Sequence, residues 1–451
     1  MTTPPPVALP VPYRDPVAAF APLAGEPHAI LLDSAAEPGR YTYLAETPFR
    51  IVTADEEGVR VDGARTRGDP FSVLASEMAR HRRSSRPDLP PFQGGAVGVF
   101  GYELGRYLER LPPPHPADLG WPDMVVGLYD TLAAFDLREE RAWVFADTEV
   151  KAQTFADKLA SSPPLPELEW NGGAGWRAET DRSAYLGKVR QAKEWIAAGD
   201  IFQVNLSQRF ITEMPAAPTP FQLYRRLRSL NPAPFSAWIG GGHGRALLSA
   251  SPEQFLRLDP AGRLETRPIK GTRPRAADPA ADLALARELV ESPKDRAENL
   301  MIVDLLRNDL AKVCRLGSIA VPQLCRLESF ATVHHLVSVV TGHLRPGLSA
   351  VDVLRATFPG GSITGCPKIR AMEILHEMEP VRRGPYCGAA AWLGFDGAMD
   401  ASILIRSLVL GNGRVAAQAG GGIVADSDEA AEYEETLTKI TPLLRALEPR
   451  P

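Results

Sequence analysis

The sequence predicts an α+β protein. Short alternations of apolar and polar residues dominate the first third of the chain, which is typical of strands. In the remainder, periodicities of three and four residues mark several helices between further strands. With 451 residues, 44% apolar and 23% charged, the chain can bury a large core. Its length suggests two or three structural units.

Charge, cysteine content and hydropathy exclude several classes of function. A net charge of -5 argues against general nucleic-acid binding, which needs a basic surface. No pair of the four cysteines has the two-residue spacing of a zinc or redox site, so we expect reduced thiols. No apolar run reaches the roughly 18 residues of a membrane span, and no signal peptide is evident. We therefore expect a cytoplasmic protein that binds no membrane.

The elements follow from local patterns. Residues 1–15 are rich in proline and are expected to form a loose tail. Strands are predicted at residues 29–34, 40–44, 49–52, 94–102, 124–136, 142–146, 201–210, 233–239, 246–249, 389–395, 402–410 and 415–419. Helices are predicted at residues 71–80, 182–198, 221–230, 282–291, 296–313, 349–357, 368–378 and 428–447.

A stretch rich in proline and glycine at residues 161–175 separates the first third from the rest. The helix after it is marked by Asp181, a suitable N-cap, and by Gly199, which can end it. The predicted organisation is an N-terminal lobe at residues 16–165, a linker at residues 166–180 and a catalytic region at residues 181–448.

The strand predicted at residues 201–210 carries a row of hydrogen-bonding side chains. Gln203, Asn205, Ser207 and Arg209 share one side of it, because side chains alternate between the two faces of a strand. An exposed sheet face and the wall of a polar cleft both explain this row.

Lys270 stands between an apolar residue and a Gly-Thr pair at the end of a short alternating run. A surface lysine at a strand end is one interpretation. The other is a nucleophilic amine in a cleft, whose pKa must fall from about 10.4 through burial or a nearby cation. Arg267, Arg273 and Arg275 would supply positive potential.

Carboxylates occupy unusual positions on two predicted helices. Glu298 shares a face with apolar residues. Its carboxylate either interacts favourably with the positive end of the helix dipole or binds a metal ion. Glu432, Glu435 and Lys439 share one face of the last helix, as a surface ion pair or as part of a site. Residues 358–368 form a glycine-rich loop before a helix, where backbone amides can hold an anion.

Together these segments resemble one family, the chorismate-utilising enzymes, which includes anthranilate, aminodeoxychorismate, isochorismate and salicylate synthases. The resemblance covers residues 25–445 and is strongest after Asp181. It rests on motifs at residues 199–204, 251–253, 267–272, 298–301, 307–310, 361–368, 405–407, 420–424 and 432–439. It implies two large antiparallel sheets packed face to face with helices outside, interleaved lobes, and an active site in the cleft between the lobes.

Two positions distinguish the reactions of the family. Gln203 stands where isochorismate and salicylate synthases have a lysine that activates water. Lys270 stands where anthranilate synthases have alanine and aminodeoxychorismate synthases have lysine. The chain therefore resembles the aminodeoxychorismate type, which converts chorismate and ammonia to 4-amino-4-deoxychorismate for 4-aminobenzoate and folate synthesis. Anthranilate synthase component I is the alternative.

The resemblance also implies roles for individual residues. Lys270 would be the nucleophile and Glu253 the general acid. Magnesium would be bound by Glu298 and Glu435, with Glu432 nearby, because Mg²⁺ prefers a few hard oxygen ligands. The implied substrate-binding residues are Gln203, Thr272, His335, Thr364, Gly365, Tyr386, Arg406, Gly421 and Lys439.

Two binding partners beyond chorismate follow from the same resemblance. The sequence shows no glutaminase segment, so a separate glutamine amidotransferase subunit would supply the ammonia. Asp33 replaces a glutamate common in feedback-inhibited relatives, which favours a structural over a regulatory tryptophan. The residues implied for a tryptophan pocket are Leu32, Ser34, Asn231, Pro232 and Phe235.

Overall fold

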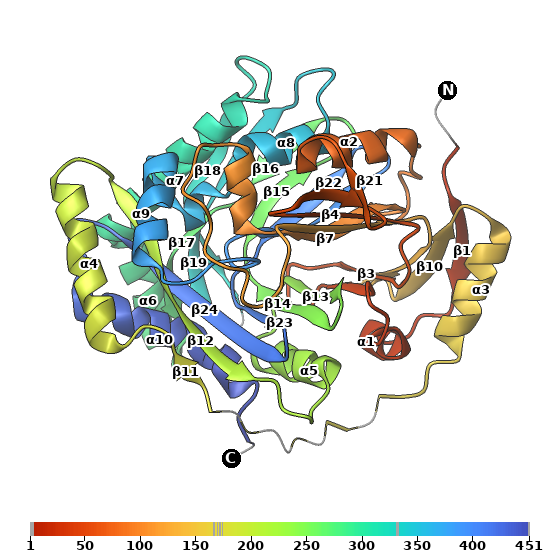
Figure 1. Ribbon diagram of the computed structural model, residues 1–451, viewed down its shortest axis with the longest axis horizontal. Helices are drawn as coiled ribbons and strands as arrows, with labels where there is room; N and C mark the ends of the chain where they lie inside the picture. Colours follow the sequence, from red (N-terminus) through yellow and green to blue (C-terminus); the bar gives the residue numbers. More distant parts are fainter. Residues whose placement is uncertain are drawn as a thin grey trace.

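Two large antiparallel sheets form the centre of the molecule, and helices lie outside them (Figure 1). The structure, a computed structural model, describes residues 4–165, 167, 168, 170, 173, 175–330 and 333–449. Over these residues each sheet has twelve strands. This confirms the predicted fold class.

Sheet 1 runs, in spatial order, through β1 (Val7–Val11), β10 (Arg141–Ala146), β9 (Leu132–Asp136), β3 (Tyr41–Ala45), β2 (Ile30–Asp33), β13 (Phe235–Gly242), β14 (Arg245–Ser251), β23 (Ser407–Gly411), β24 (Arg414–Ile423), β12 (Gln203–Glu213) and β11 (Arg177–Ala178), with β20 (Gly365–Cys366) also paired to β12. Sheet 2 runs through β17 (Ile269–Pro274), β19 (Val333–His343), β16 (Arg263–Thr266), β15 (Gln254–Leu258), β22 (Met399–Ile403), β21 (Ala389–Gly394), β7 (Gly95–Phe100), β8 (Met124–Tyr129), β4 (Arg50–Asp55), β5 (Gly58–Val61) and β6 (Ala64–Thr66), with β18 (Ala320–Ser329) paired to β19.

The sheets meet face to face through a shared apolar core. Val97 and Trp392 of sheet 2 pack in one cluster with Ile30 and Ile239 of sheet 1. Burial of such side chains contributes about 25 cal/mol per Å² of apolar surface and drives the sheets together. Both sheets contain strands from either side of the predicted linker, because β2 pairs with β13 and β7 pairs with β21.

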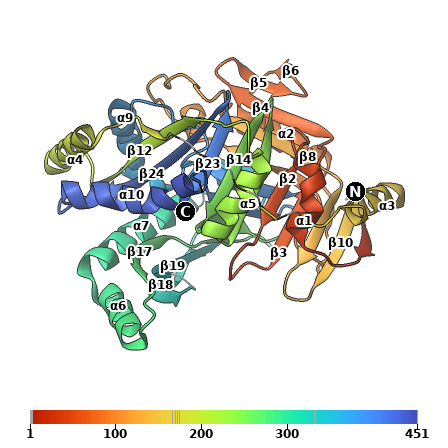
Figure 2. The same ribbon diagram turned by 90° about the horizontal axis from the view of Figure 1, so that it is seen from below.

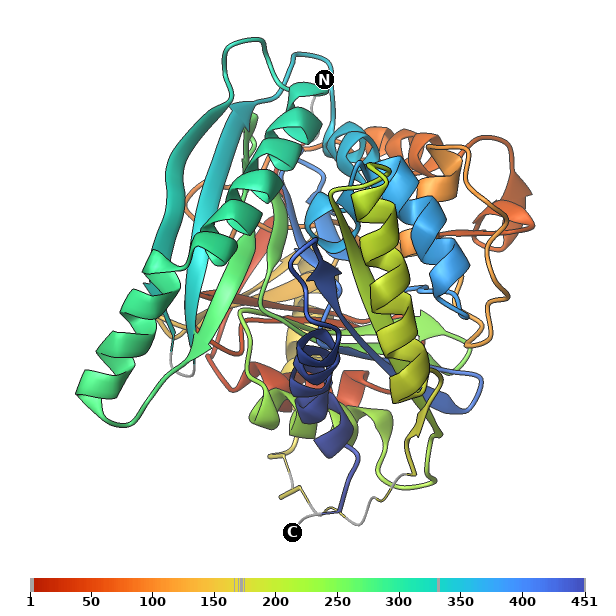
Figure 3. The same ribbon diagram turned by 90° about the vertical axis from the view of Figure 1, so that its left-hand side faces the viewer.

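The helices cover the outer faces. They are α1 (Pro16–Phe20), α2 (Pro70–Arg80), α3 (Glu149–Ala160), α4 (Arg182–Ala197), α5 (Pro220–Leu230), α6 (Pro279–Glu291), α7 (Pro293–Ala311), α8 (Ala350–Thr357), α9 (Lys368–Met378) and α10 (Glu429–Arg445). Figure 2, which is seen from below, shows α5 in front of β14, and Figure 3 shows α6 and α7 lying along β17 and β19. None of the described helices is both long and apolar enough to cross a bilayer.

Most helix starts follow the local signals read from the sequence. Asp181 caps α4 by accepting a hydrogen bond from Ala184 N, and Gly199 beyond its end has a φ of +83°. Ser349 and Asp352 form a reciprocal capping box at α8. The four cysteines are free, as predicted.

Four expectations about the elements are wrong or incomplete. The tail predicted at residues 1–15 contains β1, which pairs with β10 at the edge of sheet 1. Residues 124–136 and 402–410 were each expected to be one strand, and each is two strands that belong to different sheets. The helix α3 and the strands β18 and β19 were not predicted.

The described part of the predicted linker is packed against the C-terminal helix. Trp170 Nε1 donates to Glu448 O at 2.7 Å, and the Arg226 guanidinium lies 4.3 Å from the centre of its indole ring. Trp176 Nε1 donates to Leu444 O at 3.2 Å. Residues 166, 169, 171, 172 and 174 of the linker lie outside the described residues.

Candidate active site

Predicted site residues lie where the chain crosses between the two sheets. Glu253 follows β14 of sheet 1 and precedes β15 of sheet 2. Arg406 lies on the return crossing between β22 and β23, with a φ of +54°. Ala250 N donates to Arg406 O at 3.0 Å and Ile403 N donates to Glu253 O at 3.1 Å. The two crossings are therefore held side by side.

Lys270 lies on β17, next to an irregular pairing with β19 that extends from Ile269 to Thr272. Gly271, with a φ of +84°, allows this bulge. The Lys270 side chain is 13% exposed, and its Nζ lies 3.1 Å from Glu298 Oε1. Nζ also donates to Ser362 O at 3.2 Å. The surface-lysine interpretation of Lys270 is wrong.

The charge environment of Lys270 differs from the one expected. Burial lowers the pKa of Lys270, but the carboxylates of Glu298 and Glu253 outweigh burial, so the pKa lies above its ordinary value. The three arginines that were expected to lower it are neutralised by carboxylates of their own. Arg267 pairs with Glu328, Arg273 with Glu288 and Asp295, and Arg275 with Asp282.

Glu298 and Gln203 form the next part of the site. Glu298 lies beyond the first turn of α7 and accepts a hydrogen bond from Gln203 Nε2 at 2.9 Å. Burial raises the pKa of Glu298, but Lys270, the hydrogen bond from Gln203 and the charge of Lys439 together outweigh burial, so the pKa lies below its ordinary value. Gln203 Oε1 is buried without a hydrogen-bond partner in the described structure. A free acceptor beside an amine suits a polar substrate.

The polar row that begins at Gln203 is not an exposed sheet face. All four of its side chains are buried: Gln203, Asn205, Ser207 and Arg209. Only Gln203 touches the Lys270–Glu298 pair, whereas Arg209 pairs with Asp118 and Glu179. Gln203 therefore belongs to the site, whereas Arg209 stabilises the fold through its ion pairs.

Glu253 has the environment of a proton donor. It is 7% exposed, and burial raises its pKa above the ordinary range. Lys270 and hydrogen bonds from Ser362 and Ile269 oppose this shift without cancelling it. A carboxylate with a raised pKa takes up a proton more readily, and the acid that it then forms is suited to general acid catalysis.

Arg406, Tyr386 and His335 lie near a place where an anion can bind. Burial lowers the pKa of Arg406 to about 10, and no described carboxylate lies within 4 Å of it. Tyr386 is 5% exposed and interacts electrostatically with Arg406. Burial lowers the pKa of His335 to about 4, so it is neutral at pH 7. His335 Nδ1 lies 2.9 Å from Thr272 Oγ1 on the paired strand.

The glycines of β24 leave room for carboxylates from two helices. A Cβ atom on Gly421 would lie 3.1 Å from Glu432 Oε2 and 3.4 Å from Glu435 Oε1. A Cβ atom on Gly422 would lie 3.1 Å from Glu298 Oε1. Side chains here would therefore displace the carboxylates expected to bind a metal ion.

These carboxylates are engaged by other groups. Glu298 bonds Lys270, Glu435 bonds Lys439, and Glu432 accepts from Ser427 Oγ at 2.7 Å. Among the described residues no three acidic, histidine or cysteine side chains are grouped closely enough to hold a metal ion. A carboxylate pair completed by oxygen atoms of a substrate suits Mg²⁺ better than an all-protein cage.

The glycine-rich loop is held rigidly beside Lys270. Thr364 is fully buried, and its hydroxyl donates to Gly360 O at 2.8 Å. Gly365 has a φ of +139°, and a Cβ atom on it would lie 2.3 Å from Gln203 O. Lys368 Nζ donates to Asp309 Oδ2 at 2.7 Å, which ties the loop to α7.

One supporting ion pair was missed by the sequence analysis. Arg383 is buried against Glu379 and donates to Ile363 O at 3.1 Å and to Asn205 O at 2.7 Å. Glu379 accepts from Ser207 N and Oγ at 2.9 and 2.6 Å. An Arg-Arg pair ordinarily indicates a solvated surface. The nearby Tyr386 was the only signal that this pair borders the site.

The residues implied for a tryptophan pocket gather elsewhere, at one end of sheet 1. Leu32 on β2 pairs with Ala237 of β13, and Ala35 N donates to Ala233 O at 3.1 Å. The Ser34 hydroxyl is engaged with Tyr41 O. The set comprises Leu32, Ser34, Asn231, Pro232 and Phe235, and Lys270 lies in the other sheet.

The chain matches known proteins along nearly its whole length. A model of the family described as chorismate binding enzyme matches residues 27–445. The chain belongs to this family. It is 43% identical to aminodeoxychorismate synthase component 1 of Klebsiella aerogenes over 98% of this chain and 99% of that protein. It is 42% identical to anthranilate synthase component 1 of Thermus thermophilus over 96% and 95%.

A solved structure gives the same result. The crystal structure of anthranilate synthase component I from Streptococcus pneumoniae TIGR4 is 33% identical, with a TM-score of 0.82 over 90% of this chain and 93% of that one. Relatives of two kinds thus lie at nearly equal identity. Individual site residues must therefore indicate which of the two reactions this chain catalyses.

Proposed function

We propose that this family member converts chorismate and ammonia to 4-amino-4-deoxychorismate, as an aminodeoxychorismate synthase component. The observation that carries the proposal is the Lys270 amine, which is partly buried between Glu298 and Ser362. The similarity to aminodeoxychorismate synthase component 1 supports it. A lysine there provides a nucleophile that an alanine would lack.

The first half of the reaction uses Lys270 and Glu253. Lys270 is protonated at rest, so its ammonium first gives a proton to Glu253. The free amine then attacks carbon 2 of chorismate, the ring double bonds shift, and the 4-hydroxyl takes a proton from Glu253 and leaves as water. Hydroxide is a poor leaving group, and the raised pKa of Glu253 supports this role.

The second half restores the enzyme. Ammonia forms a bond to carbon 4, the double bonds shift back, and the bond between carbon 2 and Lys270 breaks. The departing Lys270 amine then takes a proton from the new ammonium group at carbon 4, which restores the resting Lys270 ammonium. Two displacements place the amino group at carbon 4. Direct attack of ammonia at carbon 2 would instead lead towards anthranilate.

The remaining residues bind and orient the substrate. Arg406 is a half-buried cation that donates to Lys439 O and makes no ion pair with a described carboxylate, which supports a role in binding a substrate carboxylate. Lys439, Tyr386 and neutral His335 would help to bind the same carboxylate, and Thr364, Gly365 and Gly421 would form the wall of the pocket. Gln203 offers a free acceptor, and Thr272 orients His335.

Glu298 and Glu435, with Glu432 nearby, would hold Mg²⁺ when substrate is bound. The metal ion would offset the charge of the substrate carboxylate and orient the ring. Because Lys270 and Lys439 neutralise two of these carboxylates without metal, we expect EDTA to abolish turnover without lowering the melting temperature. Calorimetry with and without EDTA tests this, and a large fall in melting temperature would contradict it.

A separate glutamine amidotransferase subunit would supply the ammonia. The relatives are named as component 1, which implies a second component, and free ammonium should replace it in the test tube. A tryptophan bound at the end of sheet 1 would be structural. Adding tryptophan should therefore leave the rate unchanged, and inhibition at micromolar concentrations would refute this.

One assay decides between the two reactions. The purified chain is incubated with chorismate, Mg²⁺ and ammonium, with and without an aminodeoxychorismate lyase. We expect 4-aminobenzoate only when the lyase is present. Fluorescent anthranilate formed without the lyase would overturn the proposal.

A further inference from the structure

Arg383, which follows α9, is a buried cation with contacts beyond its ion pair. Its side chain is 2% exposed and that of its partner Glu379 is 4% exposed. Arg383 Nε and Nη2 donate to the two carboxylate oxygens of Glu379, each at 2.7 Å. A buried ion pair is costly to desolvate and is often no more stable than apolar residues of the same volume. Stability alone is therefore a weak reason for this pair.

The same guanidinium connects two walls of the active site. Nη1 donates to Ile363 O of η3 (Gly361–Ile363) at 3.1 Å, and Nη2 donates to Asn205 O of β12 at 2.7 Å. Asn205 N in turn donates to Thr364 O at 2.9 Å. Arg383 and β12 therefore hold two successive carbonyl groups of the glycine-rich loop.

Two buried tyrosine rings confine the guanidinium. Its central carbon lies 4.7 Å from the ring centre of Tyr102 and 5.7 Å from that of Tyr386. Guanidinium groups are attracted to aromatic rings, and their planar fork presents its donors in fixed directions. A lysine at this position would keep the charge, but its single nitrogen atom could not reach the carboxylate and both carbonyl groups in the same way.

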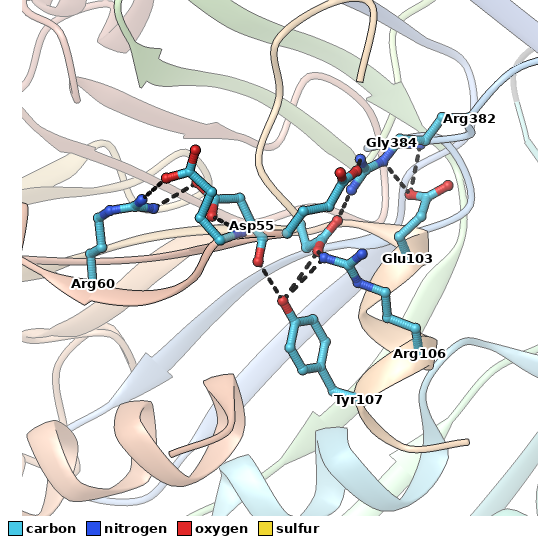
Figure 4. A network of polar contacts seen from close by, with 10 residues as sticks. Asp55, Arg60, Glu103, Arg106, Tyr107, Arg382 and Gly384 are labelled. Carbon is cyan, nitrogen blue, oxygen red and sulfur yellow. Dashed lines mark hydrogen bonds and ion pairs between the residues drawn. The ribbon is translucent and has the colours of Figure 1, made fainter. Parts of the chain in front are cut away.

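The first lobe fixes the backbone of Arg383. Glu103, on η2 (Tyr102–Tyr107), accepts from Arg383 N and Gly384 N at 3.0 and 2.9 Å. Figure 4 shows the Glu103 carboxylate beside Gly384 and Arg382. Because its backbone is anchored in this way, the Arg383 side chain gives the glycine-rich loop a fixed point of attachment.

This attachment lies next to the group that holds the Lys270 amine. The amine has two partners, Glu298 on α7 and Ser362 O of the loop. Ser362 directly precedes Ile363, whose carbonyl group accepts from Arg383. A shift of the loop would therefore move both carbonyl groups and change the position of the amine. A displacement of about 1 Å in a reacting group can slow a reaction about a hundredfold.

We propose that Arg383 is a positioning residue for the attack by Lys270: through Ile363 O it fixes the loop segment whose Ser362 carbonyl group orients the amine. Arg383 acts through the backbone of the loop rather than on the substrate. The inference rests on the proposed function, because that function makes Lys270 the nucleophile. Loss of the guanidinium fork should slow bond formation to chorismate more than it weakens the binding of chorismate.

Two variants remove the fork in different ways. Arg383→Lys keeps a positive charge opposite Glu379. In the double variant Arg383→Met with Glu379→Gln, no unpaired charge is left, and the new amide oxygen can still accept from Ser207. Arg209→Lys is the matched control, since the Arg209 side chain is 3% exposed and also pairs with carboxylates.

The rate of adduct formation with chorismate, in the absence of ammonia, is measured by rapid quenching and intact-protein mass spectrometry. We expect both Arg383 variants to form the adduct at least about tenfold more slowly, and the chorismate concentration for half-maximal rate to change less than about threefold. The rate of Arg209→Lys should stay within about twofold of wild type. Hydrogen exchange of the amides at residues 361–365 should be faster in Arg383→Lys than in wild type or Arg209→Lys.

Melting temperatures verify that each variant is folded at the temperature of the kinetics. A wild-type rate in a folded Arg383 variant, or an equal loss of rate in Arg209→Lys, would overturn the proposal. So would unchanged exchange of the loop in Arg383→Lys. If the wild-type chain forms no adduct, the proposed function fails instead, and the exchange measurement still shows whether Arg383 holds the loop.

Discussion

At the scale of single residues, Lys270 determines which reaction this chain can perform. Its amine is held by Glu298 and Ser362 rather than solvated, so its position is fixed before substrate arrives. Fixing a nucleophile in this way removes much of the entropic cost of the attack. The raised pKa means that a proton must leave the amine first, and the buried carboxyl group of Glu253 lies in the same site to receive it.

Replacing Lys270 should remove the covalent intermediate. Without ammonia, the wild-type chain incubated with chorismate should gain the mass of chorismate less one water, and Lys270→Ala should not. Intact-protein mass spectrometry measures this. Lys151→Ala, which removes an exposed lysine paired with Asp130, is the matched control and should form the adduct normally. An adduct that persists in Lys270→Ala would refute the assignment of the nucleophile.

Asp400 gives a prediction about pH and stability. Burial raises its pKa to about 6, although Gln254 Nε2 donates to it at 3.0 Å. The folded state thus binds more protons than the unfolded state, and this group's contribution to stability is lost as pH rises from about 4 to 6. Asp400→Asn should therefore stabilise the protein, by about 1 kcal/mol more at pH 8 than at pH 5.

Urea unfolding at the two pH values measures this difference in the free energy of unfolding. Asp88→Asn, at an exposed position, is the control and should show no comparable change between pH 5 and pH 8. If Asp400→Asn is equally or more stabilising at pH 5, the raised pKa is not the cause.

At the scale of elements, local signals predicted the helices well and sheet membership poorly. α9 begins and ends where the sequence indicated, and α4 is capped by Asp181 as expected. By contrast, residues 402–410 read as one strand because both halves alternate. The chain passes from sheet 2 to sheet 1 between these halves, at Arg406. Arg406 has a positive φ, which a non-glycine residue rarely adopts and which the sequence pattern does not indicate.

The site residues also divide into those that the sequence predicted and those that it did not. Family motifs drew attention to Lys270, Glu253 and Glu298, and the structure brings these three together. Composition gave no indication of the buried Arg383 or of its partner Glu379. These depend on which side chains find partners in three dimensions, and a sequence pattern carries no such information.

The glycine-rich loop offers a test at this scale. Gly365→Ala would place a methyl group 2.3 Å from Gln203 O. Gln203 belongs to β12, and its backbone cannot move away without breaking the pairing of β12 with β20. Gly347 also has a positive φ, of +87°, but open space around it. Both variants carry backbone strain, so their difference isolates the steric effect.

We expect Gly365→Ala to lose about 1–3 kcal/mol more stability than Gly347→Ala and to raise the KM for chorismate at least tenfold. Urea unfolding and steady-state kinetics measure the two effects. Equal losses in both variants would show that the close packing of the loop on β12 is not required.

At the scale of the whole molecule, the interleaving of the lobes is the dominant feature. β2 and β3 of the first lobe lie in the same sheet as β13 and β14, and β7 and β8 lie in the same sheet as β21 and β22. The core between the sheets contains apolar side chains from both sides of the linker. Dividing the chain there would separate β2 from β13 and β7 from β21, which exposes two strand edges on each fragment together with this core.

The full chain should therefore unfold in one cooperative transition, and neither half should fold alone. Fragments 1–165 and 175–451, expressed separately, should be insoluble or lack near-ultraviolet circular dichroism, because each loses strand partners in both sheets. Co-expression should recover some soluble complex, since the missing partners are then available. Two separate calorimetric transitions of the full chain, or a stably folded 175–451 fragment, would show that the catalytic region is independent of the first lobe.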